Sequence, residues 1–312
     1  MTQPPAVPVC YRHPDRETYV RCTRCNRPIC PSCMNEASVG FQCPECVREG
    51  ARTQRPARTA FGGGSSGTQG TVTITLIVIN VLVFVFSLIS AGRDAAHSVA
   101  GGGLGGLLGG SNPLTEWGAV VSYATAQGTD IRLASDTIAD GNWYRLFTAM
   151  FLHYGLLHLG LNMWALWVLG RPLEAALGRM RFLALYLLCG LGGNVLAFVL
   201  SGPNVASAGA STAVYGLFAA LIVVMRRMRA SVAGILPVLV FNLVLSFSIS
   251  GVSWQGHVGG LITGALVALG FAYAPRERRN TIQIATIVGA VVLIGVGFAV
   301  GLASIPAVGY SA

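Results

Sequence analysis

The sequence has no lysine and little charge of either sign. All 21 basic residues are arginines, 12 residues are acidic, and charged residues make up only 11% of the 312 residues. A soluble domain typically carries about 25% charged residues. Hydrophobic residues make up 53% of the chain, and the mean hydropathy is +0.61. This composition excludes an ordinary soluble domain and predicts a polytopic membrane protein. No apolar run precedes residue 71, so a cleavable signal peptide is not expected.

Seven stretches are apolar enough to cross a bilayer as helices, which takes about 20 residues each. They cover residues 71–91, 149–170, 181–201, 211–229, 232–250, 254–274 and 281–303. Arginines follow the second, fourth and sixth stretches, whereas the connections after the third and fifth carry no charge. Because cytoplasmic loops are rich in basic residues, the N-terminus is predicted to be cytosolic and the C-terminus to lie outside.

Composition divides the chain into four parts. Residues 1–47 form a polar cysteine-rich module, and residues 48–70 a flexible linker of arginine, glycine and serine. Residues 71–303 form the transmembrane domain, followed by a short outer tail at 304–312.

The cysteine-rich module carries eight metal-ligating residues in four pairs. One Cys-x2-His pair precedes three Cys-x2-Cys pairs: Cys10, His13, Cys22, Cys25, Cys30, Cys33, Cys43 and Cys46. Four pairs suit two tetrahedral zinc sites. Disulfides are the alternative, but they are rare in a reducing cytosol. We therefore expect two structural zinc ions, without which a module so poor in apolar residues does not fold.

The order of these pairs resembles a B-box-like zinc finger, in which ligand pairs interleave. The resemblance implies one ligand set of Cys10, His13, Cys30 and Cys33 and a second of Cys22, Cys25, Cys43 and Cys46. Sequential pairing is the alternative. The arginines of the module form no defined basic face, so a protein partner is expected rather than a nucleic acid. The eighth cysteine, Cys189, lies in an apolar stretch and is expected to be a small core residue.

Polar side chains in the apolar stretches are costly and usually functional. His158 and Asn162 are four residues apart and share one face of the second stretch. Ser211 begins the fourth stretch, and His257 lies near the start of the sixth. These three stretches run from outside to inside, which places His158, Ser211 and His257 each within about 15 Å of the outer end of its stretch. Ordinary helix packing is the alternative, but it does not explain the histidines.

These residue types suit acyl transfer. A serine hydroxyl becomes a nucleophile when an imidazole accepts its proton, so Ser211 is the predicted nucleophile and His257 the general base. His158, Asn162 and the backbone N–H of Ser211 are candidate donors to an oxyanion. No acidic residue lies in the apolar stretches to orient His257, so the sequence predicts a dyad rather than a Ser-His-Asp triad, with no cofactor for catalysis.

Small residues lie beside both predicted catalytic residues. Gly209 and Ala210 precede Ser211, and glycines recur every fourth residue around His257, at 256, 260 and 264. Such spacing lets two helix backbones approach closely, as a direct contact between the serine and the histidine requires.

Three segments together resemble the rhomboid family of intramembrane serine proteases: residues 142–170, 209–217 and 256–264. The resemblance covers about 71–303 and implies an all-α six-helix bundle followed by a seventh transmembrane helix. It implies the roles given above for Ser211, His257, His158 and Asn162. It further implies that Tyr215 stacks on the catalytic imidazole. Three more residues take supporting positions: Arg145, His153 and Gly209.

The resemblance implies a serine endopeptidase that cleaves in or near transmembrane segments of other membrane proteins, in the plasma membrane of a bacterium. At one position the sequence departs from the family, since Thr212 replaces the glycine that usually follows the serine. A β-branched residue adds bulk beside the oxyanion site. A weak or inactive rhomboid-like protein that binds membrane-protein clients is therefore the alternative. A transporter is a third hypothesis, although the sequence shows no inverted repeats.

Overall fold

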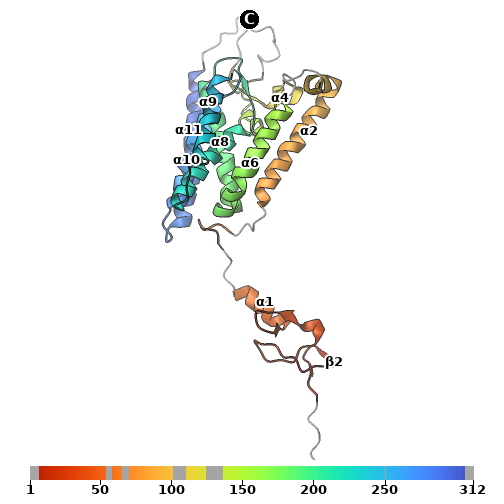
Figure 1. The fold of residues 1–312 in the computed structure, drawn as a ribbon. Coiled ribbons are helices and arrows are strands. Elements are labelled where there is room, and N and C mark those ends of the chain that lie inside the picture. The colour runs from red at the N-terminus through yellow and green to blue at the C-terminus, as the bar shows by residue number, and fades with distance from the viewer. Residues whose placement is uncertain are drawn as a thin grey trace, which may run out of the picture. The chain divides into compact units, whose positions relative to one another are not determined.

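The structure is a computed structural model, and it describes residues 7–53, 58–64, 70–100, 110–123, 136–249 and 251–305, without the side chains of 93–100. The chain divides into two compact units, Met1–Ala57 and Arg58–Ala312 (Figure 1). Residues 306–312 of the expected outer tail lie outside the described residues.

The first unit consists of short elements around its cysteines. Strand β1 (Val9–Cys10) pairs with β2 (His13–Glu17), and β3 (Asn35–Glu36) pairs with β4 (Phe41–Gln42), both antiparallel. A 3-10 turn covers Pro31–Cys33, and helix α1 covers Pro44–Thr53. The buried cluster consists of six cysteines and Ile29. The unit therefore has almost no apolar core apart from its thiols.

The second unit is a bundle with a helix at each of the seven predicted stretches (Figure 1). These helices are α2 (Thr71–Ala100), α6 (Leu156–Leu177), α7 (Arg179–Leu200), α8 (Ser211–Arg227), α9 (Leu236–Ser248), α10 (Trp254–Tyr273) and α11 (Arg279–Ser304). Among the described residues, four helical segments are long and apolar enough to cross a membrane: Thr71–Gly92, α7, α10 and α11. Helices α8 and α9 are shorter, with 17 and 13 residues. The predicted all-α polytopic fold is confirmed.

The bounds predicted for α6 were wrong at both ends. Residues Ala149–Phe151 form a separate 3-10 turn, and α6 begins only at Leu156, after the extended Gly155. At its other end α6 continues past Arg171 and Pro172 to Leu177. Basic residues mark where a helix leaves the bilayer, but a helix can continue into water beyond that point.

The added final turn of α6 carries Glu174, which is fully buried. Its carboxylate accepts hydrogen bonds from the backbone N–H groups of Val72 and Thr73 and from the Thr73 hydroxyl, at 2.9–3.0 Å. The first N–H groups of a helix have no partner within it, and a negative charge there is favourable. Glu174 is therefore the N-terminal cap of α2.

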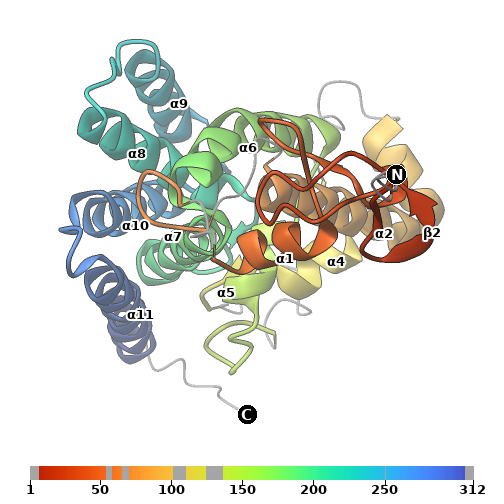
Figure 2. The same ribbon diagram turned by 90° about the horizontal axis from the view of Figure 1, so that it is seen from below.

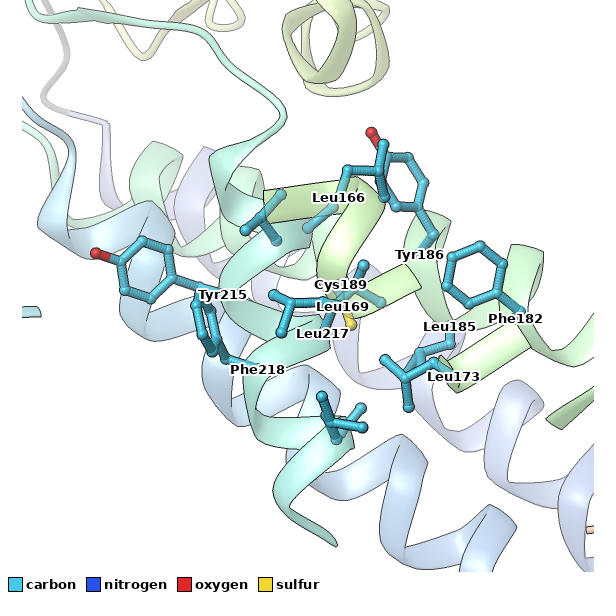
Figure 3. Packing of buried hydrophobic residues seen from close by; sticks show 14 of the residues in the cluster. Leu166, Leu169, Leu173, Phe182, Leu185, Tyr186, Cys189, Tyr215, Leu217 and Phe218 are labelled. Carbon is cyan, nitrogen blue, oxygen red and sulfur yellow. The ribbon is translucent and has the colours of Figure 1, made fainter. Parts of the chain in front are cut away.

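Leucines and aromatic residues form the core between α6, α7 and α8 (Figure 3). It includes Leu166, Leu169 and Leu173 of α6, Phe182 and Tyr186 of α7, and Leu217 of α8. Cys189 is fully buried in the same core. Helix α8 packs against α6, α7 and α10, and α11 packs on α7 and α10 (Figure 2).

Glycines let the backbones of α8 and α10 touch. A Cβ atom on Gly260 would overlap the carbonyl oxygen of Thr212, and one on Gly264 would overlap that of Gly216. Any larger residue would therefore push the two helices apart. This contact fixes the first turn of α8 beside the first turn of α10.

Part of the expected linker is packed on the bundle. Residues 58–64 form a turn in which Phe61 is buried, and its backbone N–H donates to the carbonyl of Ala176. The Gln283 amide in turn donates to the carbonyl of Phe61. The turn thus connects the end of α6 to the start of α11.

Candidate functional site

Ser211 and His257 lie in direct contact. Ser211 is the first residue of α8, and His257 lies in the first turn of α10. The Ser211 Oγ and His257 Nε2 atoms are 2.8 Å apart, a hydrogen-bond distance. His257 is buried, whereas Ser211 is partly exposed. A reactant can therefore reach the hydroxyl while the imidazole is shielded from bulk water.

Tyr215 packs against the imidazole ring of this pair. It lies one turn after Ser211 on α8, and its ring stacks on the imidazole of His257 with centroids 4.1 Å apart and planes 12° apart. The stacking that the family resemblance implied is therefore present. The stacked tyrosine ring restricts rotation of the imidazole away from the orientation in which its Nε2 contacts Ser211.

Sequence reasoning missed a third side chain in contact with the histidine. Ser246 of α9 places its Oγ 2.7 Å from Nδ1 of His257. The same Oγ lies 2.7 Å from the Tyr215 hydroxyl oxygen and donates to the carbonyl of Asn242 at 2.9 Å. The available signal was Asn242 and Ser246 spaced four residues apart in an apolar stretch, the spacing that singled out His158 and Asn162.

Gly209 leaves a small space between His158 and Ser211. A Cβ atom on Gly209 would lie 2.8 Å from Nε2 of His158 and 3.4 Å from Oγ of Ser211. The φ angle of Gly209 is +146°, which side chains rarely adopt. The imidazole nitrogen and the serine hydroxyl therefore face the same space, which only glycine leaves open.

Asn162 is buried on the same face of α6 as His158. One N–H of its amide donates to the carbonyl of His158 at 2.9 Å. An amide has two N–H groups, so this bond within the helix leaves a second donor.

The supporting residues Arg145 and His153 are both buried. The Arg145 guanidinium donates to the carbonyls of Glu116 and Ala119 at 2.8 and 3.0 Å, at the end of helix α4 (Pro113–Gly118). The Nε2 atom of His153 accepts the backbone N–H of Ala210 at 3.5 Å. These contacts hold the end of α4 and the residue before Ser211 in place.

The extra bulk of Thr212 lies between α7, α8 and α10. A Cβ atom on Gly193 would lie 2.8 Å from Cβ of Thr212, and one on Gly256 would lie 2.8 Å from its Cγ2. Thr212 is buried, and its hydroxyl has no hydrogen-bond partner among the described residues. The two glycines therefore make room for the threonine side chain within the helix contact.

The eight ligating residues of the first unit form two clusters. One contains Cys10, His13, Cys30 and Cys33, and the other Cys22, Cys25, Cys43 and Cys46; within each, the ligand atoms lie within 4.8 Å of one another. The Cys30 and Cys33 sulfurs lie 3.3 and 3.4 Å from Nδ1 of His13, and the Cys25 and Cys43 sulfurs are 3.7 Å apart. Two sulfurs bound to one tetrahedral zinc lie about 3.8 Å apart, so both clusters fit such an ion.

The thiols within one cluster differ in acidity. Burial acts to raise the pKa of Cys10, but backbone hydrogen bonds from Cys30 and Arg12 outweigh it and lower the pKa to about 6. Burial and the thiols of Cys10 and Cys30 raise the pKa of Cys33 to about 11. A divalent cation removes this difference, since it favours the thiolate form of every ligand.

Comparison with known proteins places this site in a family. The Rhomboid domain matches residues 140–275. The chain is 32% identical to YdcA of Bacillus subtilis over 148 residues, which is 46% of this chain and 73% of YdcA. The chain belongs to the rhomboid family. Ser211, His257, His158 and Asn162 all lie within its rhomboid domain, and so does Ser246.

Other members of the family share the same region. The rhomboid protease GluP of Bacillus subtilis is 39% identical over 163 residues, which is 49% of this chain and 32% of GluP. The rhomboid protease AarA of Providencia stuartii is 26% identical over 182 residues, which is 49% of this chain and 64% of AarA. The match to this chain thus covers about a third of the length of GluP.

Proposed function

We propose that this protein is an intramembrane serine endopeptidase that cleaves in or near transmembrane segments of other membrane proteins. The observation that carries the proposal is the 2.8 Å contact between Ser211 Oγ and His257 Nε2 inside a rhomboid domain. Membership of a family that includes GluP and AarA, both named rhomboid proteases, supports the reaction class.

In the proposed reaction, His257 Nε2 accepts the hydroxyl proton of Ser211 as Oγ attacks the substrate carbonyl carbon. The carbonyl oxygen becomes an oxyanion. Its proposed donors are His158 Nε2 across the space left by Gly209, the free N–H of Asn162 and the backbone N–H groups that begin α8.

The tetrahedral intermediate then collapses. The C–N bond breaks, and His257 gives the proton to the leaving amine, which departs with the C-terminal part of the substrate. Water attacks the remaining ester, again with His257 as the base, and releases the N-terminal part and the free hydroxyl of Ser211.

We also propose that the two clusters of the first unit each hold one structural zinc ion, in the interleaved pairing of a B-box-like finger. The short distances between ligand atoms support this assignment. Zinc supplies folding energy there and takes no part in the proposed hydrolysis.

We further propose that the N-terminus is cytosolic and that the protein spans the plasma membrane. The arginines after the second, fourth and sixth predicted stretches support this orientation. It places the Ser211 end of α8 near the outer face, where water can reach the site.

The test uses the full chain in liposomes with a panel of single-span substrates. We expect cleavage by the wild type and none by Ser211→Ala or His257→Ala, at equal insertion. A fluorophosphonate probe is expected to label the wild type but not Ser211→Ala. Equal cleavage by Ser211→Ala would overturn the proposal. A wild type that captures single-span proteins without cleavage or labelling would instead establish the alternative, a binding protein for membrane clients.

A further inference from the structure

Ser246 contacts the ring nitrogen of His257 that faces away from Ser211. The hydroxyl oxygen lies 2.7 Å from Nδ1, while Nε2 contacts the serine nucleophile. We propose that Ser246 is a positioning residue whose hydroxyl holds His257 in the tautomer that a general base requires. This inference rests on the proposed peptidase function and adds a third member to the predicted dyad.

The hydrogen-bond capacity of the Ser246 hydroxyl selects the tautomer. A hydroxyl has one donor and two acceptor positions. The donor is used on the carbonyl of Asn242, one turn earlier in α9, at 2.9 Å. The oxygen must then accept from its two other neighbours, the Tyr215 hydroxyl and His257 Nδ1, both at 2.7 Å.

This assignment has one chemical consequence for His257. If Nδ1 carries the proton that Ser246 accepts, Nε2 of the neutral imidazole has a free lone pair. That lone pair points at the Ser211 hydroxyl, 2.8 Å away. The other tautomer would place a proton on Nε2, which could then not take the proton of Ser211.

The position of Ser246 on α9 supports the same role. Leu239 and Ser246 are the buried residues of this helix, while most of its apolar side chains, among them Phe241 and Phe247, are exposed. A buried hydroxyl without partners costs free energy, but Ser246 has three partners. The one buried polar side chain of α9 thus contacts the proposed catalytic histidine.

A hydroxyl in this position differs from the aspartate of a Ser-His-Asp triad. Both accept the Nδ1 proton, but the hydroxyl is neutral, and a neutral group is far less costly than a carboxylate within a membrane. It orients the imidazole without stabilising the imidazolium by charge. We therefore expect Ser246 to contribute on the order of 10- to 100-fold to kcat, less than a triad aspartate does.

The test compares hydroxyl deletions on one helix in the full chain, with a cleavable single-span substrate. Ser246→Ala is expected to lower kcat on the order of 10- to 100-fold with KM unchanged, and Ser246→Thr to restore most of the loss. Ser248→Ala is the matched control, because Ser248 is exposed and its hydroxyl bonds back to the carbonyl of Val244 in the same way. Unchanged kcat in Ser246→Ala, or an equal loss in Ser248→Ala, would overturn the inference.

The histidine tautomer is measured separately by NMR of protein labelled at histidine with 13C and 15N. In the wild type we expect the proton of neutral His257 on Nδ1, and in Ser246→Ala a mixture of tautomers. A wild-type proton on Nε2 would overturn the inference even if the enzyme cleaves. Failure of the wild type to cleave any substrate would overturn the peptidase function instead, while the tautomer measurement still decides the role of Ser246.

Discussion

The two units of this chain place their reactive side chains by different means. In the first unit the buried cluster is six cysteines and Ile29, so the thiols are themselves the core. In the bundle the reactive side chains lie at helix ends that are already fixed by leucines, aromatic residues and glycine contacts. We infer that the thiol clusters depend on a bound ion for their geometry, whereas the Ser211–His257 contact depends on helix packing and on side chains that the helices hold.

Removal of metal should produce the largest difference in behaviour between the two units. Structural zinc contributes on the order of 10 kcal/mol to the folding of small finger domains. Chelation of the full chain should therefore unfold residues 7–53 and leave the bundle intact, as measured by hydrogen exchange. Metal analysis should find two zinc ions per chain, fewer in Cys30→Ser, and two in the control Cys189→Ala. Equal protection of residues 7–53 with and without chelator would contradict the dependence on metal.

A glycine substitution should act on the bundle alone. In Gly260→Ala the added Cβ overlaps the carbonyl of Thr212, and overpacking of this kind costs about 3 kcal/mol. The thermal midpoint and the cleavage rate should both fall, while the zinc content stays the same. Gly295→Ala on α11 is the control, since nothing lies within 4 Å of its added Cβ. A bundle equally stable in both variants would show that the close α8–α10 contact does not determine the stability of the bundle.

A methyl group at Gly209 should affect both the chemistry and the local backbone, whose φ of +146° side chains rarely adopt. It would fill the space between His158 Nε2 and Ser211 Oγ, which is the proposed site of the oxyanion. We expect Gly209→Ala to lower kcat by about 100-fold, the effect of losing one oxyanion donor. Gly202→Ala, in the same connection but with open space around it, should retain activity. Wild-type kcat in Gly209→Ala would exclude this space as the oxyanion site.

The smallest expected effect is at Glu174. Glu174→Gln keeps an acceptor for the N–H groups of Val72 and Thr73 but loses the charge that favours a helix N-terminus. We expect a loss of about 1 kcal/mol in unfolding free energy, measured by denaturant titration in mixed micelles. Glu277→Gln at an exposed position is the control. A loss no larger than that of the control would mean that the charge contributes nothing to the cap.

Much of the site could be predicted from the sequence because its residue types are rare in apolar helices. Histidines stand out in apolar helices, and His158, Ser211 and His257 were each predicted near the first residues of its own apolar stretch, which brought the three together. The seven helices followed from apolar length alone. The division of the eight ligating residues into two sets of four came from their spacing and from the resemblance to a B-box-like zinc finger.

Ser246 and Glu174 were missed for separate physical reasons. Serine is common in apolar helices, where its hydroxyl bonds back to the backbone of the same helix. A serine in the sequence of α9 therefore does not by itself indicate a functional role, which becomes visible only when its neighbours in the fold are known. Glu174 lies beyond the arginine that marked the end of the second predicted stretch. Its role depends on where α2 lies in the bundle, and the sequence around Glu174 does not indicate that position.

The cap of α2 has a consequence for the order in which this protein is assembled. Glu174 follows Thr73 by 101 residues. At a synthesis rate of about 5–20 residues per second, the start of α2 waits roughly 5–20 s for its carboxylate. During this time the N–H groups of Val72 and Thr73 must find other partners. The first helix of the bundle to be synthesised can therefore be completed only after the second, since it requires the last turn of α6.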